Sequence, residues 1–514
     1  MAFLCTLYFC NFKCKVVTLP FILNMENSKK EINSDNLPQI SLFKSLIPVV
    51  ILVALLAFNV IEIYGDDALS GANQFALLIG AAVAGIVGVF NKTSYKTIME
   101  YIAKNIKSTA GAILILLMVG ALAGTWLLSG IIPAMVYYGL QVLHPSIFLV
   151  ACVIICSLIS VSTGSSWTTS ATVGIALIGI AEVLGISTGM TAGAILSGAY
   201  FGDKLSPMSD TTNLAPAMAG TDLFTHIRYM TLTTVPSILV TLIVFLIIGF
   251  TLDTSQIGDQ REILDAISVS FNVTPWLFVV PVLVIVMIVK KTPPLIALLV
   301  GTLLGAVAAL VFQPDLVVLV AEETAFNLNS AYKGIMNAIT VDITIPTENK
   351  YLIDLFSASG MSGMLGTIWL ILCAMVFGGV MEAIGALAAI SRALLNLFHT
   401  TFGLFASTVA SCLALNATAS DQYLAIVVPG KMFSKAYRDK GLAPENLSRA
   451  LEDSGTVTSV LIPYNTCGAY HSGVLGVSVA DYFVYAIFNY ISPFMTLIFA
   501  AFNIKIRQLK NAKA

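Results

Sequence analysis

Long blocks of hydrophobic residues, separated by short polar segments, fill most of this 514-residue chain. A helix that crosses a bilayer needs about 20 mostly apolar residues, and it satisfies its backbone polar groups internally. Blocks long enough to predict such helices lie at 46–64, 72–90, 110–140, 230–250, 274–290, 293–313, 362–389 and 482–503. The pattern therefore predicts an all-α polytopic membrane protein.

Four shorter or more interrupted apolar pieces form two pairs, 147–161 with 168–184 and 403–417 with 424–433. A polar stretch separates the members of each pair, "STGSSWTTS" in the first and "NATASDQ" in the second. We predict that each pair is a re-entrant helical hairpin, which enters and leaves the bilayer on the same side. Irregular backbone at membrane depth is tolerated only inside protein or beside a wet cavity, so the tips are expected there.

Each hairpin is followed by a long apolar segment, 191–225 or 447–479, that polar sequence interrupts near its centre. An offset of 256 residues places the tip at Ser165 on the tip at Asp421, and the break at Pro207 on the break at Pro463. Residue identity between the halves is low, but the order of hairpin, polar tip and broken helix occurs twice. We therefore predict two transmembrane repeats.

Lysine and arginine positions orient these predicted elements. Only 11% of the residues are charged, less than half of the roughly 25% found in soluble domains. Segment 91–107 carries four lysines, so the excess of positive charge in cytoplasmic loops places it inside. Alternation from there places both termini inside and the acidic segment 314–361 outside. The two hairpins then start from opposite sides, so the repeats are inverted in topology, as in many secondary transporters.

These assignments divide the chain into five parts. The order is a cytoplasmic N-terminal segment 1–43, a first repeat 44–251, an external connecting loop 252–273, a second repeat 274–505 and a cytoplasmic tail 506–514. Met25 opens a polar stretch typical of a cytoplasmic N-terminus and is a candidate start of translation. The eight cysteines lack metal-ligand spacing, so no cofactor is expected, and nothing indicates a nucleic-acid partner. We expect a multi-pass protein of the cell membrane.

Two aspartates stand beside the predicted irregular backbone, Asp210 in "SPMSDTTN" and Asp421 in "NATASD". A charge at the bilayer centre costs at least about 2.5–3.5 kcal/mol, so such a residue usually has a functional reason. We predict that Asp210 and Asp421 bind a sodium ion, because hard cations prefer oxygen ligands. Asp203 and Asp453 are candidate proton carriers.

Hydroxyl and amide side chains cluster at the same places, and in an inverted repeat they could converge on one site. Residues expected to line that pocket are Ser165, Ser166, Ser209, Thr211, Thr212, Asn213, Asn416, Thr418, Ser420, Asn465 and Thr466. Each single Ser or Thr has a plainer alternative, because these residues often form hydrogen bonds that merely join membrane helices.

Several titratable residues have two open interpretations. Glu452, next to Asp453, is either a proton carrier or part of a solvated helix start, and Lys204 may simply pair with another charge. Glu382 is either a second proton site or an interhelix hydrogen-bond partner. His471 is a candidate pH sensor, because the pKa of histidine lies near neutrality.

At these residues the chain resembles a known family. The stretches "STGSSWTTSATVGIALIGI", "SGAYFGDKLSPMSDTTNLAPAMAGTDLFTHI" and "GLAPENLSRALEDSGTVTSVLIPYNTCGAY" are similar to those of NhaC-type sodium/proton antiporters, and the resemblance covers roughly residues 44–505. It implies inverted repeats with two re-entrant hairpins and two broken helices, and a homodimer. It also implies the exchange of sodium ions for protons.

Some similar family members couple these ions to organic substrates, so an exchanger of malate and lactate, or of an amino acid, is the alternative function. That alternative favours an arginine or half-helix N-termini facing the organic carboxylate. No lone buried arginine is evident, which favours inorganic ions. An enzyme is not expected, because "YFGD" has Phe201 where intramembrane aspartyl proteases need glycine, and no H-E-x-x-H zinc motif occurs.

Overall fold

The computed structural model describes residues 39–509, apart from 65–67, 69, 143, 253–259, 350–351, 354 and 397–399. Residues 39–514 form one compact unit. The predicted segment 1–43 and tail 506–514 therefore lie partly outside the described residues.

The first half of this unit is built from helices. Their bounds are α2 (Leu42–Phe58), α3 (Ala72–Phe90), α4 (Tyr95–Ser108), α5 (Ala110–Leu128), α6 (Ile131–Val142), α7 (Pro145–Thr163), α8 (Ser166–Thr169), α9 (Ile175–Val183), α10 (Thr188–Leu205), α11 (Asp210–Ala219), α12 (Leu223–Thr251) and α13 (Gln260–Ser270).

The second half adds more helices and one short pair of strands. Their bounds are α14 (Val279–Val289), α15 (Pro294–Phe312), α16 (Pro314–Val320), α17 (Leu328–Thr340), β1 (Ile343–Thr344), β2 (Ser357–Ala358), α18 (Leu365–Ala383), α19 (Ala386–Asn396), α20 (Thr401–Thr418), α21 (Gln422–Asp439), α22 (Pro444–Leu451), α23 (Thr466–Leu475), α24 (Val479–Phe483) and α25 (Ile487–Ala501). β1 and β2 pair in antiparallel fashion.

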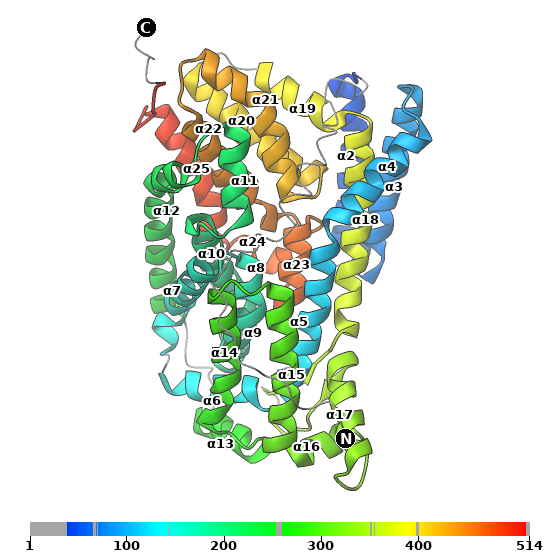
Figure 1. The fold of residues 1–514 in the computed structure, drawn as a ribbon, viewed down its shortest axis with the longest axis vertical. Helices are drawn as coiled ribbons and strands as arrows, with labels where there is room; N and C mark the ends of the chain where they lie inside the picture. Colours follow the sequence, from blue (N-terminus) through cyan, green and yellow to red (C-terminus); the bar gives the residue numbers. More distant parts are fainter. Residues whose placement is uncertain are drawn as a thin grey trace, which may run out of the picture. The chain divides into compact units, whose positions relative to one another are not determined.

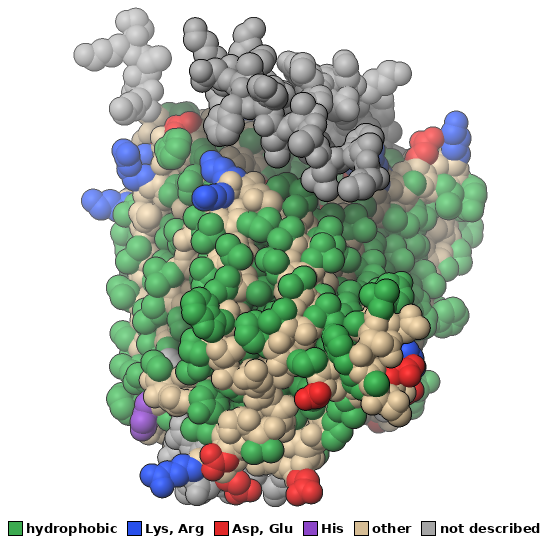
Figure 2. Space-filling view, turned by 60° about the horizontal axis from the view of Figure 1, so that its bottom comes forward, with side chains coloured by type: hydrophobic (Ala, Val, Ile, Leu, Met, Phe, Trp, Pro, Cys, Tyr) green, Lys and Arg blue, Asp and Glu red, His purple; other side chains and the backbone are tan. Residues whose placement is uncertain are grey.

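Among the described residues, nine helices are long and apolar enough to cross a membrane, or up to ten if a bent pair counts as one span. Their outward-facing side chains are also hydrophobic, as at Phe43, Phe90 and Phe250. On the face shown in Figure 2, hydrophobic side chains cover most of the surface, and charged side chains stand near its upper and lower edges. The prediction of an all-α polytopic membrane protein is confirmed.

Several predicted loops contain helices. Segment 91–107 is mostly helix α4, the connecting segment 252–273 contains α13, and segment 314–361 contains α16, α17 and the two strands. α4, α13 and α17 have polar or charged residues on one face, and their apolar residues are too few to predict a span. The polar segments predicted as loops therefore contain amphipathic helices.

The hairpin arms are longer than predicted. α7, the helix over Ser166–Val183, and α20 each pass the length and composition test for a span, with 19, 18 and 18 residues. Helix length therefore gives no support to a re-entrant path, which remains a prediction. In Figure 1, α8 lies near the middle of the view and α9 lies in its lower half, whereas α20 and α21 lie in the upper half.

The predicted offset recurs in the helix bounds. α10 and α22 begin at Thr188 and Pro444, 256 residues apart, and α11 and α23 begin at Asp210 and Thr466, again 256 apart. The two segments thus have the same order of elements at the same spacing. The inversion of one relative to the other across a membrane remains a prediction.

Small residues bring the first hairpin close to the first broken helix. A Cβ atom added at Gly198 of α10 would lie 2.3 Å from the Val153 carbonyl oxygen of α7, and one at Gly202 would lie 2.6 Å from that of Ser157. Small residues at helix contacts let backbones approach closely in membranes. Ser160 Oγ also donates to the Ala199 carbonyl at 2.6 Å, so this joint fixes the hairpin against α10.

Candidate functional site

Both broken helices resume at a capped N-terminus. Ser209 Oγ accepts a hydrogen bond from the Thr212 amide at 3.3 Å, and Asn465 Oδ1 accepts one from the Cys467 amide at 3.0 Å. Serine and asparagine are strong N-caps because their side chains satisfy amides that lack a helical partner. After each break, a new helix therefore begins at a residue whose side chain caps it.

Each hairpin tip contacts the break of its own half. Gly164 has φ of +71°, and a Cβ there would lie 2.7 Å from Met208 Cβ and 2.9 Å from the Ser209 amide nitrogen. In the second half, the Thr466 amide donates to the Ser420 carbonyl at 3.0 Å. The expected approach of the tips to the breaks is thus observed in both halves.

A cavity of about 430 Å³ lies where these elements meet. Three of the four predicted acidic residues border it, Asp203, Asp210 and Asp421. Ser165 and Thr466 border it as well. The remaining lining residues are Ser108, Thr109, Gly111, Ala112, Ile115, Thr163, Gly164, Trp167, Met208, Ile288, Lys291, Thr292, Pro293, Pro294, Gln422 and Tyr423.

Asp203 connects α10 to the first tip. Its Oδ2 accepts hydrogen bonds from the Ser166 amide at 3.0 Å and from Ser166 Oγ at 2.7 Å. Its Oδ1 is buried and makes no hydrogen bond within the described residues. A buried carboxylate oxygen without a donor is costly, so this atom is available to a proton or a cation in the cavity.

The other two carboxylates are held by helix starts. Asp421 caps α21 by accepting from the Tyr423 amide at 2.9 Å and the Leu424 amide at 3.1 Å. Asp210, in the first turn of α11, accepts from the Thr211 amide at 2.8 Å and from the Tyr423 hydroxyl. Tyr423 belongs to the second half and Asp210 to the first, so the halves meet at this carboxylate.

Within the described residues, no three His, Cys, Asp or Glu side chains lie close enough together to hold one metal ion. A small cation here would bind one or two carboxylates together with hydroxyl or backbone oxygens. The donor set is entirely oxygen at those positions, which fits a hard cation such as Na⁺.

Most of the residues predicted to line the pocket with hydroxyl or amide groups do not border the cavity. They are Ser166, Ser209, Thr211, Thr212, Asn213, Asn416, Thr418, Ser420 and Asn465. Many of them bond backbone carbonyls freed at the breaks, as when Asn213 Nδ2 donates to the Pro207 carbonyl at 3.0 Å. Asn416 Nδ2 likewise donates to the Gly455 carbonyl at 2.8 Å.

Asp453 lies apart from the cavity and has its own counter-ion. It forms an ion pair with Lys204, and both side chains are fully buried. Thr233 Oγ1 donates to Asp453 Oδ2 at 2.8 Å, and the Thr496 hydroxyl donates to the same oxygen. The pair joins α10 of the first half to the second broken helix, so Lys204 does pair with another charge.

The structure also shows the surroundings of two other predicted titratable residues, Glu382 and His471. Glu382 accepts from Lys104 Nζ at 2.7 Å and from Asn105 Nδ2 at 3.0 Å, which makes it an interhelix partner of α4. His471 is buried without hydrogen bonds among the aromatic rings of Trp167, Tyr200 and Tyr470. Within the described residues no acidic partner bonds its ring nitrogens, so these surroundings give a pH-sensing role no support.

The expectation that no lone buried arginine exists is wrong. Arg449 is fully buried, and none of its guanidinium nitrogens makes a hydrogen bond within the described residues. It lies over the ring of Tyr229, at 4.5 Å from the centroid, and near the rings of Phe499 and Phe405. Cation–π contact stabilises it there, and it does not border the cavity.

Sequence reasoning missed Tyr423, Trp167 and Lys291. Trp167 and Tyr423 each follow a tip by two residues, at the offset of 256, so the repeat alignment contained that signal. Trp167 stacks on Tyr470 of the other half with centroids 4.0 Å apart. Lys291 lies in the turn between α14 and α15, and this turn borders the cavity.

The sequence profile of the Na⁺/H⁺ antiporter family matches residues 198–504, which contain the breaks of both broken helices and the second hairpin. This chain belongs to the Na⁺/H⁺ antiporter family. The NhaC of Alkalihalophilus pseudofirmus, a Na⁺/H⁺ antiporter, is 35% identical to it over 430 residues, which are 84% of this chain and 90% of that protein.

Two relatives from Bacillus subtilis extend this similarity. Its malate-2H⁺/Na⁺-lactate antiporter is 37% identical over 435 residues, 84% of this antiporter-family chain and 88% of the relative. Its Na⁺/H⁺ antiporter NhaC is 34% identical over 406 residues, 79% of this chain and 86% of the relative. The resemblance to NhaC-type antiporters is confirmed, and these relatives are transporters rather than enzymes.

Proposed function

We propose that this chain is a secondary active transporter that exchanges Na⁺ for H⁺ at the cavity between its two halves. The observation that carries the proposal is the convergence of Asp203, Asp210 and Asp421, from both halves, on that cavity. The family and the two NhaC relatives support the choice of ions.

The mechanism rests on competition for carboxylates. A carboxylate bordering a cavity inside protein is costly to leave charged and without a partner. Either a proton or a bound cation neutralises it, so the two compete. Asp210 and Asp421 bind Na⁺, Ser165 and Thr466 supply neutral oxygens, and Asp203 carries a proton. A site that holds Na⁺ or H⁺, exposed alternately to each side, exchanges them through its differential affinity.

An exchanger of organic substrates is the second candidate, and the cavity gives a specific reason to keep it. Its volume of about 430 Å³ falls within the range of roughly 300–1,000 Å³ typical of small-molecule sites. The starts of α11, α21 and α23 border the cavity, and helix N-termini attract carboxylates. One relative exchanges malate with 2H⁺ for lactate with Na⁺.

Purified protein in proteoliposomes with an imposed pH gradient tests the choice. Na⁺, Li⁺, K⁺, and malate with lactate are added in turn while the internal pH is followed. We expect Na⁺ alone to collapse the gradient. A response only to malate with lactate would favour the second candidate, and no response to Na⁺ in any combination would contradict both.

The orientation and assembly are part of the proposal. We expect both termini to be cytoplasmic and two copies to form a homodimer. Single cysteines at Ser94 and Asn327 test the orientation, because an impermeant thiol reagent should label only Asn327→Cys from outside the cell. Labelling of Ser94→Cys instead would contradict the orientation. The mass of the purified protein, by light scattering, tests the dimer.

A further inference from the structure

Glu452 is a fully buried carboxyl with few partners. It begins a π-helical segment, Glu452–Thr456, where the second broken helix departs from α-helical geometry. Thr211 Oγ1 donates to Glu452 Oε1 at 3.1 Å, whereas Oε2 makes no hydrogen bond within the described residues. Because a buried carboxylate needs several donors or a counter-ion, this environment favours the protonated form.

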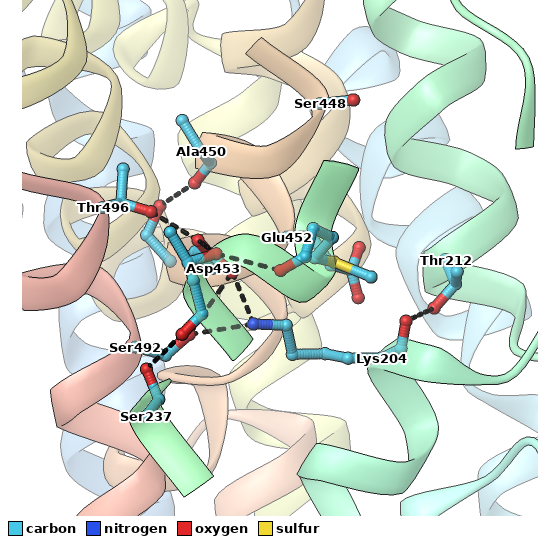
Figure 3. Close-up of polar contacts among 12 residues, drawn as sticks. Lys204, Thr212, Ser237, Ser448, Ala450, Glu452, Asp453, Ser492 and Thr496 are labelled. Atoms are coloured by element: carbon cyan, nitrogen blue, oxygen red, sulfur yellow. Dashed lines mark hydrogen bonds and ion pairs between the residues drawn. The ribbon is translucent and has the colours of Figure 1, made fainter. Parts of the chain in front are cut away.

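The neighbouring lysine is already occupied. Lys204 pairs with Asp453, and its Nζ donates to Ser492 Oγ at 2.9 Å (Figure 3). Asp453 also has the two threonine donors described above. Within the described residues no ion pair includes Glu452. Of these two adjacent acids, only Asp453 is stabilised as an ion.

A short line of hydroxyl groups runs from Glu452 through Thr211 to Ser209, the N-cap residue of α11. Thr211 Oγ1 lies 3.1 Å from Glu452 Oε1 and 3.1 Å from Ser209 Oγ. Thr211 follows Asp210, which borders the cavity, and Thr211 itself does not. Since a hydroxyl both donates and accepts a hydrogen bond, the Thr211 hydroxyl can pass a proton between Glu452 and Ser209.

We propose that Glu452 binds a second transported proton, at a site separate from the cavity, and that the Thr211 hydroxyl relays this proton. The inference rests on the proposed Na⁺/H⁺ exchange. Glu452 is neutral when it holds the proton and carries one negative charge after release, while the Lys204–Asp453 pair stays ionised. Exchange then moves more than one proton for each Na⁺ and carries net charge across the membrane.

Several titratable or charged groups surround Glu452 and set its electrostatic environment. They are Asp203 and Lys204 from α10, Cys412 from α20, and Asp453 beside it.

Proteoliposomes with set pH and voltage gradients test this site through the ratio of protons to Na⁺, obtained from the voltage at which net ²²Na⁺ flux stops. In Glu452→Gln we expect the ratio to fall by one proton, while ²²Na⁺/Na⁺ exchange, which needs no proton, stays within about twofold of the parent. Glu445→Gln is the matched control, because Glu445 in α22 pairs with the half-exposed Arg507.

An unchanged ratio in Glu452→Gln would overturn the inference. Absence of Na⁺/H⁺ exchange in the parent would instead overturn the proposed function, so the two failures are distinguishable. If Glu452→Gln does not fold, the variants Thr211→Val and Thr211→Ser test whether the Thr211 hydroxyl relays a proton to Glu452. We expect Val to slow proton-coupled uptake at least about tenfold without slowing ²²Na⁺/Na⁺ exchange, and Ser to restore the rate. Equal coupled rates in the two variants would contradict the relay.

Discussion

The two halves of the transporter share one backbone design but differ in the chemistry of equivalent positions. At the offset of 256 residues, each of the four predicted acids stands opposite a hydroxyl residue. The pairs are Asp203 with Ser459, Asp210 with Thr466, Asp421 with Ser165, and Asp453 with Ser197. The tip carries the carboxylate in the second half, and the broken helix carries carboxylates at the cavity in the first.

This complementary placement has an electrostatic consequence. In three of these pairs the carboxylate borders the cavity. A second carboxylate at each partner position would add like charge nearby, and like charges disfavour each other's ionisation. One carboxylate opposite one hydroxyl keeps the oxygen ligands that Na⁺ needs while limiting the negative charge. The repeat therefore supplies symmetric geometry, and the sequence differences make the charge asymmetric.

The largest expected effect concerns the buried ion pair, since Lys204 has Val460 at its equivalent position. Lys204→Met leaves Asp453 as a buried charge without its counter-ion, and the free energy of unfolding should fall by about 3–5 kcal/mol. The double variant Lys204→Met with Asp453→Asn should recover most of this loss. Unfolding in mixed micelles measures both changes.

A surface pair provides the control for that comparison. Lys333 and Glu323 lie 3.7 Å apart with both side chains nearly half exposed. Lys333→Met should lower the free energy of unfolding by less than about 1 kcal/mol. A loss this small in Lys204→Met would show that the buried pair contributes little to the joint between the halves.

The two tips offer a smaller test, because Gly164 and Ser420 occupy equivalent positions with positive φ, +71° and +58°. Gly164→Ala would place its Cβ against Met208 and the Ser209 backbone, so we expect a loss of about 1–3 kcal/mol. Ser420→Ala should change the stability by less than about 0.5 kcal/mol, because Ser420 Oγ has no hydrogen-bond partner within the described residues. Equal losses would mean that the tips are not packed differently.

The sequence was sufficient to predict several spans, the tips, the breaks and the acids that border the cavity. The predicted span 482–503 was wrong, because its main helix, α25, has only 15 residues. Block length determines a span such as Ala72–Phe90, and a charge placed among apolar segments marks Asp203, Asp210 and Asp421. The partner of each polar side chain could not be predicted, because it depends on which carbonyls the breaks release. Asn213 and Asn416 bond such carbonyls instead of lining the cavity.

Contacts between segments that lie far apart in the chain could not be predicted from the sequence either. Lys204 and Asp453 are separated by 249 positions, and only the packing of α10 against the second broken helix brings them together. The position of a lysine in the sequence predicts only the side of the membrane of its loop, whereas the turn that carries Lys291 borders the cavity. Local charge patterns do not contain that information.

Equilibrium binding of ²²Na⁺ to the purified protein most directly tests the claim that one cation site spans the two halves. Asp210→Asn in the first half and Asp421→Asn in the second should each weaken binding by about a hundredfold, or roughly 2.7 kcal/mol. Asp315→Asn, in α16 and away from the cavity, should leave binding unchanged. Parent-like affinity in either cavity variant would contradict a site shared by both halves.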